Sequence, residues 1–268
     1  MKVAIIPDPE KNLLDFGLEV GNWLKDKYSV LPNWGFDEKE IDMAILLGGD
    51  GFIMKKSLYL ATYKIPFLAI NCGTKGFLAV AEKDNWHEVL EKVLNGRYTI
   101  DKRQILSVSH FDAANKSRNF KAAGNVYIRH RAYMILFTVS IDGKIIYKEL
   151  GGDGVIVANV TGATAYNLAA DGALITGGLV ITPICPHALN AKSLPVPKSA
   201  KKIEIFYHGR KGGQEDDEGC LLFSDSEKFP ILPGERLEIR PLKKEALFVT
   251  QEGFSFIESL QKKLGLST

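Results

Sequence analysis

The sequence predicts an α/β domain with a parallel sheet over residues 1–100, followed by an all-β domain over residues 101–249. In the first part, short apolar runs alternate with segments of helical spacing, which is typical of a parallel sheet with right-handed crossovers. In the second part, β-prone runs follow one another between turn residues, with almost no helical spacing. Residues 254–264 return to helical spacing, and we expect the tail, residues 250–268, to pack back on the first domain.

Each element of the first domain is predicted from local hydrophobic spacing. The expected strands are continuous apolar runs, which is typical of strands buried on both faces, and they cover residues 3–6, 43–47 and 66–70. Apolar residues at helical intervals predict helices over residues 10–27, 52–63 and 84–94. Asp84 is the expected N-cap of the last helix, and Gly96 lies near its C-terminal end.

The expected strands of the second domain are short β-prone runs bounded by turn residues. They cover residues 104–111, 122–128, 134–141, 144–147, 154–157, 203–207, 220–223 and 236–240. A charged segment flanked by glycines, residues 214–218, is expected to be a solvated hairpin tip and not a metal site. Helical spacing resumes over residues 254–264.

The composition excludes several classes of protein. The chain has 268 residues, 46% hydrophobic and 25% charged, which is enough for one large domain or two modest domains with cores. The net charge of +2 does not favour nucleic acid, and no apolar run reaches the length of a membrane span. The first apolar run ends too early, at Pro7, for a signal peptide. Cys72, Cys185 and Cys220 are too widely spaced for a disulfide framework or zinc cluster, so we expect a reduced, cytoplasmic protein.

A glycine-rich turn, Gly48-Gly49-Asp50-Gly51, follows a predicted buried strand and opens a predicted helix. Ligands bind outside the carboxyl ends of such strands, and glycine lets backbone N–H groups approach a phosphate. The acid would repel that phosphate unless it binds a metal or accepts a proton from an attacking hydroxyl, which favours phosphoryl transfer. The turn alone supports equally well a second interpretation, a tight turn with Asp50 as helix N-cap.

Two further segments carry residues suited to nucleotide binding. Residues 71–78 follow the next buried strand and contain Asn71, Gly73 and Gly76. By itself this segment predicts an ordinary strand-to-helix turn. Beside the Gly48–Gly51 turn on a neighbouring strand end, a role in nucleotide binding is favoured. Residues 151–168 place Asp153 before a β-prone run and hydroxyls, glycine and Tyr166 after it. A ring and backbone can hold a base, and the acid can accept hydrogens from a sugar or amide.

With a third motif, Thr182-Pro183-Ile184-Cys185-Pro186-His187-Ala188-Leu189, these segments make the chain resemble the NAD kinase family, which uses ATP or polyphosphate. The resemblance extends more distantly to diacylglycerol and sphingosine kinases, which share the first turn. It runs across nearly the whole chain, including Lys263-Leu264-Gly265 near its end.

The resemblance implies a site between the two domains and transfer of the γ-phosphoryl of ATP, with Mg²⁺, to the adenosine ribose 2′-hydroxyl of NAD. Asp50 would be the catalytic acid–base, Gly51 would contact the dinucleotide, Lys55 would lie near phosphate and Asp153 would hold the nicotinamide end. Family members are commonly homodimers or homotetramers, so we expect a homo-oligomer. The residues expected to bind substrate or nucleotide are Gly48, Gly49, Gly51, Lys55, Asn71, Gly73, Gly76, Phe77, Asn125, Asp153, Thr164, Ala165, Tyr166, Asn167, Leu168 and Ala169.

The resemblance breaks at one substrate-binding pair. The family carries Asn-Glu or Asn-Asp at the start of a strand, where this chain has Asn125-Val126, in a register anchored on His130-Arg131. A register shifted by one residue would place Gly124-Asn125 there and would lose the asparagine as well. The loss of one charged hydrogen bond would cost on the order of 1.5–3 kcal/mol, roughly a hundredfold in affinity. Restoring the acid with Val126→Glu is the test that the sequence suggests.

Smaller departures leave the catalytic turn intact. Phe52 replaces a typical Thr, and Asp225-Ser226-Glu227 stands where Asp-Gly-Gln is common. Two alternatives remain: a dinucleotide sensor that binds NAD(P) with little or no catalysis, suggested by Val126, and a lipid or small-alcohol kinase, which the first turn alone permits.

Overall fold

The computed structural model describes residues 1–25, 27–31, 40–74, 76–210, 212, 219–225, 227–254, 260–261 and 263–265. The chain divides into two compact units, residues 1–103 with 244–268 and residues 104–243, which we call the α/β unit and the β unit. Two long strands, β6 (Tyr98–Phe111) and β17 (Arg236–Gln251), each begin in one unit and end in the other.

The α/β unit is built on a parallel sheet whose strands are the apolar runs of the sequence. The order is β4-β3-β1-β2, and each pairing is parallel. β1, β3 and β4 are buried at nearly every position, as expected for strands with helices on both faces. The bounds are β1 (Lys2–Pro7), β2 (Ser29–Leu31), β3 (Met43–Gly48), β4 (Phe67–Asn71) and β5 (Ala81–Glu82), which pairs with β4.

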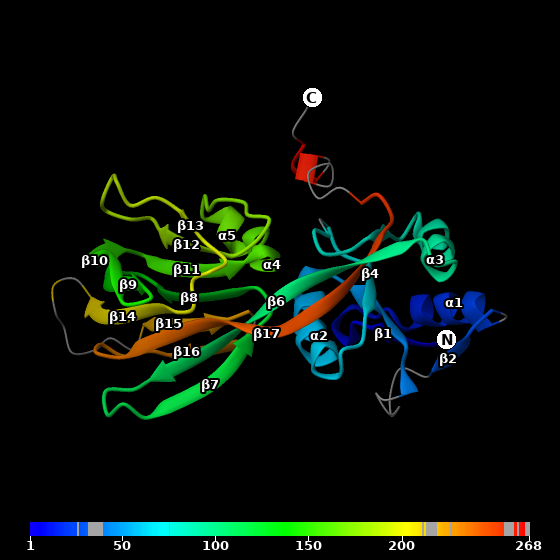
Figure 1. Cartoon of the computed structure of the whole chain (residues 1–268), viewed down its shortest axis with the longest axis horizontal. Coiled ribbons are helices and arrows are strands. Elements are labelled where there is room, and N and C mark those ends of the chain that lie inside the picture. Colours follow the sequence, from blue (N-terminus) through cyan, green and yellow to red (C-terminus); the bar gives the residue numbers. More distant parts are fainter. Residues whose placement is uncertain are drawn as a thin grey trace. The chain divides into compact units, whose positions relative to one another are not determined.

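Within the described residues, three helices pack on this sheet. They are α1 (Leu14–Lys25), α2 (Asp50–Tyr63) and α3 (Trp86–Leu94), and a single 3-10 turn, η1 (Pro9–Lys11), precedes α1. α1 and α3 share one apolar cluster with the strands, and α2 lies across the strands from them (Figure 1). The expected cap of α3 is wrong, because the N-cap is Asn85 and not Asp84; the Asn85 side chain accepts the Glu82 N–H at 2.8 Å.

The β unit consists of two sheets that face each other. One has the order β13-β12-β11-β8-β15-β16; the other contains β10-β9-β14-β17 together with β6 and β7 (Figure 1). Two short helices, α4 (Val160–Ala163) and α5 (Tyr166–Ala169), follow β11. The strand bounds are β7 (Ser117–Ala122), β8 (Asn125–His130), β9 (Ile135–Ile141), β10 (Lys144–Gly152), β11 (Gly154–Asn159), β12 (Leu179–Ile184), β13 (Leu194–Val196), β14 (Ile203–Arg210), β15 (Cys220–Ser224) and β16 (Glu227–Pro230).

The core of the β unit is formed by alternate residues of both sheets. Ile203 and Ile205 of β14 point inward from one sheet, and Val126 and Ile128 of β8 point inward from the other. Successive side chains of a strand point to opposite faces, so this cluster fixes which residues of each strand face outward. The parallel α/β unit and the all-β unit confirm the predicted fold class.

One predicted strand is two strands in the structure. Residues 122–128 were expected to be continuous, but β7 ends at Ala122 and β8 begins at Asn125 in the other sheet. Between them, the N–H groups of Ala123 and Gly124 bind the Asp225 carboxylate at 2.5 and 3.0 Å instead of a neighbouring strand. A side chain a hundred residues away therefore causes the break, which local spacing does not reveal.

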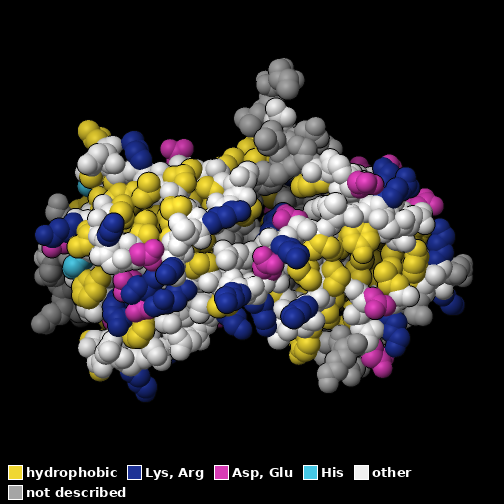
Figure 2. All heavy atoms as spheres, viewed as in Figure 1, with side chains coloured by type: hydrophobic (Ala, Val, Ile, Leu, Met, Phe, Trp, Pro, Cys, Tyr) yellow, Lys and Arg dark blue, Asp and Glu magenta, His cyan; other side chains and the backbone are white. Residues whose placement is uncertain are grey.

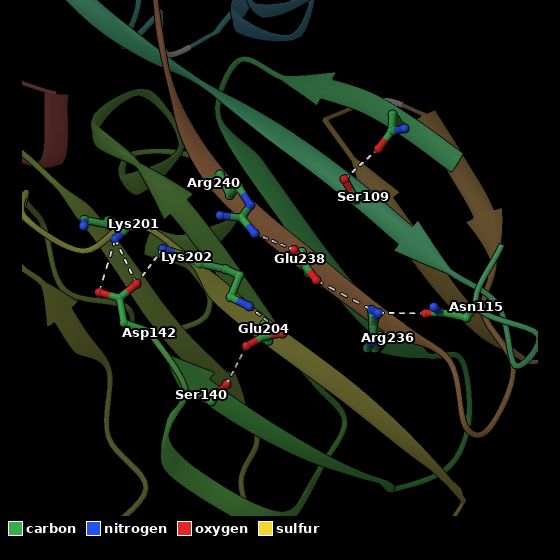
Figure 3. A network of polar contacts seen from close by, with 11 residues as sticks. Ser109, Asn115, Ser140, Asp142, Lys201, Lys202, Glu204, Arg236, Glu238 and Arg240 are labelled. Carbon is green, nitrogen blue, oxygen red and sulfur yellow. Dashed lines mark hydrogen bonds and ion pairs between the residues drawn. The ribbon is translucent and has the colours of Figure 1, made fainter. Parts of the chain in front are cut away.

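The outer face of β14 and β17 carries paired charges. Figure 3 shows Glu238 between Arg236 and Arg240, with ion-pair distances of 3.7 and 2.8 Å. At the start of the neighbouring strand β14, Lys202 Nζ lies 3.0 Å from Glu204 Oε1. In the space-filling view, Lys and Arg alternate with Asp and Glu over this region (Figure 2). Because the charges are interspersed, this face is a solvated surface and not a basic patch.

Some expectations concern segments that lie partly or wholly outside the described residues. The charged segment 214–218 lies outside them, as does much of the expected C-terminal helix over residues 254–264. In the described part of that tail, Lys263 Nζ donates to the Gly76 carbonyl of the α/β unit. Among the described residues, every helix is too short or too polar to span a membrane.

Candidate active site

The glycine-rich turn lies between β3 and α2. Gly48 is the last residue of β3, Gly49 is the N-cap and Asp50 is the first residue of α2. The interpretation of Asp50 as N-cap is therefore wrong, because the extended Gly49 occupies that position. What remains is a carboxylate presented at the carboxyl end of a buried parallel strand, where α/β proteins bind ligands.

The Asp50 carboxylate is oriented by the loop that follows β4. Its Oδ2 accepts the Phe77 N–H at 3.0 Å, and its Oδ1 accepts the Leu78 N–H at 3.0 Å. A carboxylate has about four acceptor positions, so each oxygen keeps one for a ligand. Two backbone donors thus fix the direction of the carboxylate and leave it able to accept a proton.

Asn71, at the end of β4, organises this loop. Its side chain is buried; Oδ1 accepts the Gly73 N–H at 2.9 Å, and Nδ2 donates to Glu82 Oε2 at 2.7 Å. Gly76 has a φ of +59°, and a Cβ there would lie 2.4 Å from Asn71 Cγ. Glycine is therefore required at position 76, and both Asn71 and Gly76 set the path of the chain towards Phe77.

Sequence reasoning missed Lys11, the last residue of η1. Its Nζ lies 3.2 Å from where a Cβ on Gly49 would be and 3.4 Å from the corresponding position on Gly73. The signal was present, because β1 pairs in parallel with β3, and the residues after both strands emerge at the same edge of the sheet. Lys55, which the sequence analysis placed near phosphate, is exposed on the second turn of α2.

The second motif folds into the turn between β11 and α5. Asn159, which sequence reasoning also missed, caps α4: its Oδ1 accepts the Gly162 N–H at 3.0 Å. Its Nδ2 donates to the Ala123 carbonyl at 2.7 Å, which ties the turn to the start of β8. The cap explains why a β-prone run is followed at once by a helical turn.

The predicted nucleoside-binding residues differ in what their side chains can reach. Asn167 is fully buried; its amide donates to two backbone carbonyls at 3.2 Å each, and its Oδ1 accepts the Thr182 hydroxyl at 2.7 Å. The Thr164 hydroxyl donates to a backbone carbonyl at 3.3 Å. These side chains stabilise the turn itself. The predicted residues with exposed surface are Ala165, Tyr166, Leu168 and Ala169.

An aromatic row lies beside this turn on the outer face of the sheet. The rings of Tyr166 and Tyr127 are 4.8 Å apart, and Tyr127 stacks on Phe223 at 4.5 Å with 14° between the ring planes. All three residues are half-buried. A planar ring system such as a nucleotide base can pack against such rings.

Asp153 lies half-buried between β10 and β11, and its N–H donates to the Ile184 carbonyl at 2.9 Å. Desolvation raises the pKa of the Cys185 thiol above its ordinary value, and a hydrogen bond with Asp153 raises that pKa further. Burial likewise raises the pKa of the Cys72 thiol. Since the thiolate is the nucleophilic form, neither cysteine is activated for attack.

Asn125 lies at the start of β8, buried against the turn after β11. A Cβ on Gly162 would lie 2.3 Å from the Asn125 Oδ1. The Asn125 N–H donates to the Asp225 carboxylate at 3.0 Å, beside two further backbone donors. Burial raises the pKa of Asp225, and the three N–H bonds act in the opposite direction. Asp225 thus binds the backbone of residues 123–125, where the chain passes from β7 in one sheet to β8 in the other.

Val126 points away from this turn. It is 0% exposed and belongs to the apolar core between the two sheets. The next residue, Tyr127, faces the opposite side, with Tyr166. A glutamate at position 126 would therefore enter the core and would not reach the turn. The Val126→Glu variant suggested by the sequence cannot restore a ligand contact in this fold.

No metal-binding group of three His, Cys, Asp or Glu residues is present in the described part of the chain. A cavity of about 750 Å³ lies at the β6–β7 hairpin, lined by His110, Arg118, Leu232 and Glu235 among others. None of the predicted site residues lines it. The predicted site residues therefore fall into two groups, each described within its own unit: the Asp50 turn in the α/β unit and the turn after β11 in the β unit.

Two family models match the chain: the ATP-NAD kinase N-terminal domain over residues 9–98 and the ATP-NAD kinase C-terminal domain over residues 125–251. Among similar curated proteins, the NAD kinase of Lachnoclostridium phytofermentans is 34% identical over 234 residues, covering 85% of this chain and 81% of the relative. The NAD kinase of Carboxydothermus hydrogenoformans is 33% identical over 255 residues, covering 90% and 88%.

Solved structures share the fold. A yeast NADH kinase complexed with NADH has a TM-score of 0.85 at 20% identity, covering 100% of this chain and 88% of that one. An NAD kinase from Archaeoglobus fulgidus in complex with ATP has a TM-score of 0.75 at 22% identity and covers 100% of both chains. At these identities the structural likeness concerns the fold.

Proposed function

The chain belongs to the NAD kinase family, and we propose that it transfers the γ-phosphoryl group of ATP to the adenosine ribose 2′-hydroxyl of NAD, which yields NADP. The observation that carries the chemistry is the orientation of Asp50. Its carboxylate lies at the carboxyl end of β3, held by two backbone N–H groups, with one acceptor position left on each oxygen.

In the proposed reaction, Asp50 is the general base. The ribose hydroxyl oxygen attacks the γ-phosphorus, a new O–P bond forms, and the bond from the γ-phosphorus to the β,γ-bridging oxygen breaks, releasing ADP. The hydroxyl proton passes to Asp50. A positioned base of this kind contributes roughly 10²–10⁴-fold to the rate. The glycines on both sides of Asp50 keep side chains away from the approaching phosphates.

The β unit supplies the proposed nucleoside contacts. The aromatic row of Tyr166, Tyr127 and Phe223 offers ring faces to a base, and Asp153 offers a carboxylate to an amide or sugar hydroxyl. Asn125 is assigned to the same pocket through the resemblance. These roles, like the division into a catalytic and a dinucleotide-binding domain, are part of the proposal.

A divalent cation fits this arrangement as a companion of the nucleotide. Mg²⁺ in such enzymes is bound by one or two carboxylates together with substrate phosphates, and it neutralises their charge. Asp50 has free acceptor positions for this purpose, and the described residues contain no separate three-ligand cluster. Polyphosphate as an alternative donor and a homodimeric or homotetrameric state complete the proposal.

The structure removes the reason for proposing a dinucleotide sensor without catalysis. The sensor was suggested by the valine that replaces the family's acid, but Val126 faces the core, so its identity does not report on ligand contacts. A lipid or small-alcohol kinase has no specific observation in its favour, since both the N- and C-terminal family models describe ATP-NAD kinases.

The proposal is tested by incubating the protein with NAD, Mg²⁺ and ATP, and in parallel with polyphosphate. NADP is detected through a dehydrogenase that accepts only the 2′-phosphorylated cofactor, so that the position of transfer is tested as well. We expect NADP in the ATP reaction at a rate proportional to enzyme. Failure to exceed the enzyme-free control with both donors would reject the function, and lipid or sugar phosphorylation without NADP would support the related kinases instead.

A further inference from the structure

The backbone around Lys11 directs this residue over the ends of β3 and β4. β1 ends at Pro7, and the next residue, Asp8, donates its N–H to the Leu47 carbonyl at 2.8 Å, which joins the end of β1 to β3. Asp8 Oδ1 accepts the Glu10 N–H at 3.1 Å, and the Lys11 N–H donates to the Asp8 carbonyl at 3.2 Å. This single 3-10 turn fixes where the Lys11 side chain starts.

The Lys11 ammonium reaches the glycines of both loops. It lies 3.2 and 3.4 Å from the positions that side chains on Gly49 and Gly73 would occupy. Those two glycines are themselves neighbours, since the Cβ position of Gly73 is 3.5 Å from the Gly49 Cα. The ammonium is thus placed beside backbone that has no side chains of its own, one residue from Asp50.

The charge of Lys11 is not neutralised by a nearby acid. Among the described residues, no carboxylate oxygen lies within 4.0 Å of its Nζ. Its recorded contact is a long hydrogen bond of 3.4 Å to the Cys72 carbonyl, at an exposed position. An ammonium can donate three hydrogen bonds, so at least two remain for a ligand.

We propose that Lys11 binds the phosphate groups of the phosphoryl donor in front of Gly49 and Gly73, next to Asp50. This inference rests on the proposed function and deepens it. The acceptor hydroxyl must approach Asp50 to lose its proton, so the donor phosphates are the anions that lie beside that contact. Lysine suits this position because it binds phosphate as a point charge and can follow the phosphoryl group during transfer.

The kinetic test compares Lys11→Ala with Lys11→Arg, which keeps the charge, and with Lys25→Ala. Lys25 is an exposed lysine and the last residue of α1, a helix of 12 residues that begins just after Lys11. Lys25→Ala therefore removes the same charge as Lys11→Ala, but at the other end of that helix. We expect Lys11→Ala to lower kcat/KM for ATP by roughly 10- to 100-fold, the value of one charged hydrogen bond. KM for NAD at saturating ATP should change by less than about threefold, Lys11→Arg should recover most of the loss, and Lys25→Ala should match the wild type.

A second measurement does not depend on turnover. Calorimetry with inorganic pyrophosphate as the probe should show binding to the wild type that weakens by a similar factor in Lys11→Ala and falls with added salt. Equal pyrophosphate binding in wild type and Lys11→Ala would overturn the inference, as would a loss confined to KM for NAD. A wild type that binds pyrophosphate through Lys11 but forms no NADP would reject the proposed function and leave the phosphate site standing.

Discussion

The Val126→Glu variant distinguishes two expectations, because the sequence and the structure predict opposite effects of this substitution. The resemblance places an acid of the family at position 126, so the substitution would be expected to strengthen NAD binding. The structure places Val126 in the core of the β unit at 0% exposure, between two sheets. We therefore predict that Val126→Glu destabilises the protein and does not improve its activity.

The size of the effect follows from the burial of this side chain. Removing a fully buried valine forfeits about 1.5–3 kcal/mol of apolar burial. Placing a carboxyl group there without a partner costs about 1–3 kcal/mol more, even when the group is protonated. A loss of about 3–6 kcal/mol is a large fraction of the typical stability of a folded protein, about 5–15 kcal/mol. At about 2–4 °C per kcal/mol, the thermal midpoint should fall by roughly 6–24 °C.

The assay has to report on the β unit. Residues 104–243, which form the β unit, contain no tryptophan, so tryptophan fluorescence would miss the relevant transition. Far-ultraviolet circular dichroism during heating follows both units. The control is Arg129→Glu, which places the same acid on the exposed face of the same strand and should shift the midpoint little. A Val126→Glu protein with the wild-type midpoint and a higher kcat/KM for NAD would refute the placement of Val126 in the core.

Three further predictions concern other residues of the site. Asp225→Ala should lower the stability of the β unit by about 3 kcal/mol or more, measured by the same thermal transition, because it leaves three backbone N–H groups without their acceptor. Tyr166→Ala should weaken NAD binding measured by calorimetry by roughly 10- to 100-fold, the value of one stacked base, and unchanged affinity would exclude Tyr166 from the pocket. Cys185 should react with iodoacetamide more slowly than a free thiol at pH 7.5, because its pKa is raised, and Asp153→Asn should lower that pKa and speed the reaction.

The parts of the fold that local spacing determines were predictable. Strands β1, β3 and β4 are apolar at nearly every position because helices cover both faces, and that burial is visible in the sequence. The place of Asp50 at the junction of β3 and α2 followed from the same pattern. Local spacing did not separate a carboxylate that caps its own helix from one oriented by Phe77 and Leu78, 27 and 28 residues away.

The parts that depend on contacts between distant residues were not predictable in this way. The break between β7 and β8 is caused by Asp225, and the direction of Val126 depends on which sheet faces which. Lys11 could be recognised as a site residue only once the parallel pairing of β1 with β3 brought the ends of these strands together. β12 was missed although its second half, Thr182–Ile184, belongs to the third motif, because its proline, Pro183, lowers its strand propensity.

The central claim is that the Asp50 carboxylate takes the proton from the acceptor hydroxyl, and Asp50→Asn tests it most directly. The asparagine keeps the shape but turns its NH₂ group towards one of the two backbone donors, so a stability loss of about 1–3 kcal/mol is expected. The rate of NADP formation by the folded variant should fall at least about 100-fold, while its affinity for NAD stays within a few-fold of wild type. A variant that forms NADP at a rate close to that of the wild type would contradict this mechanism.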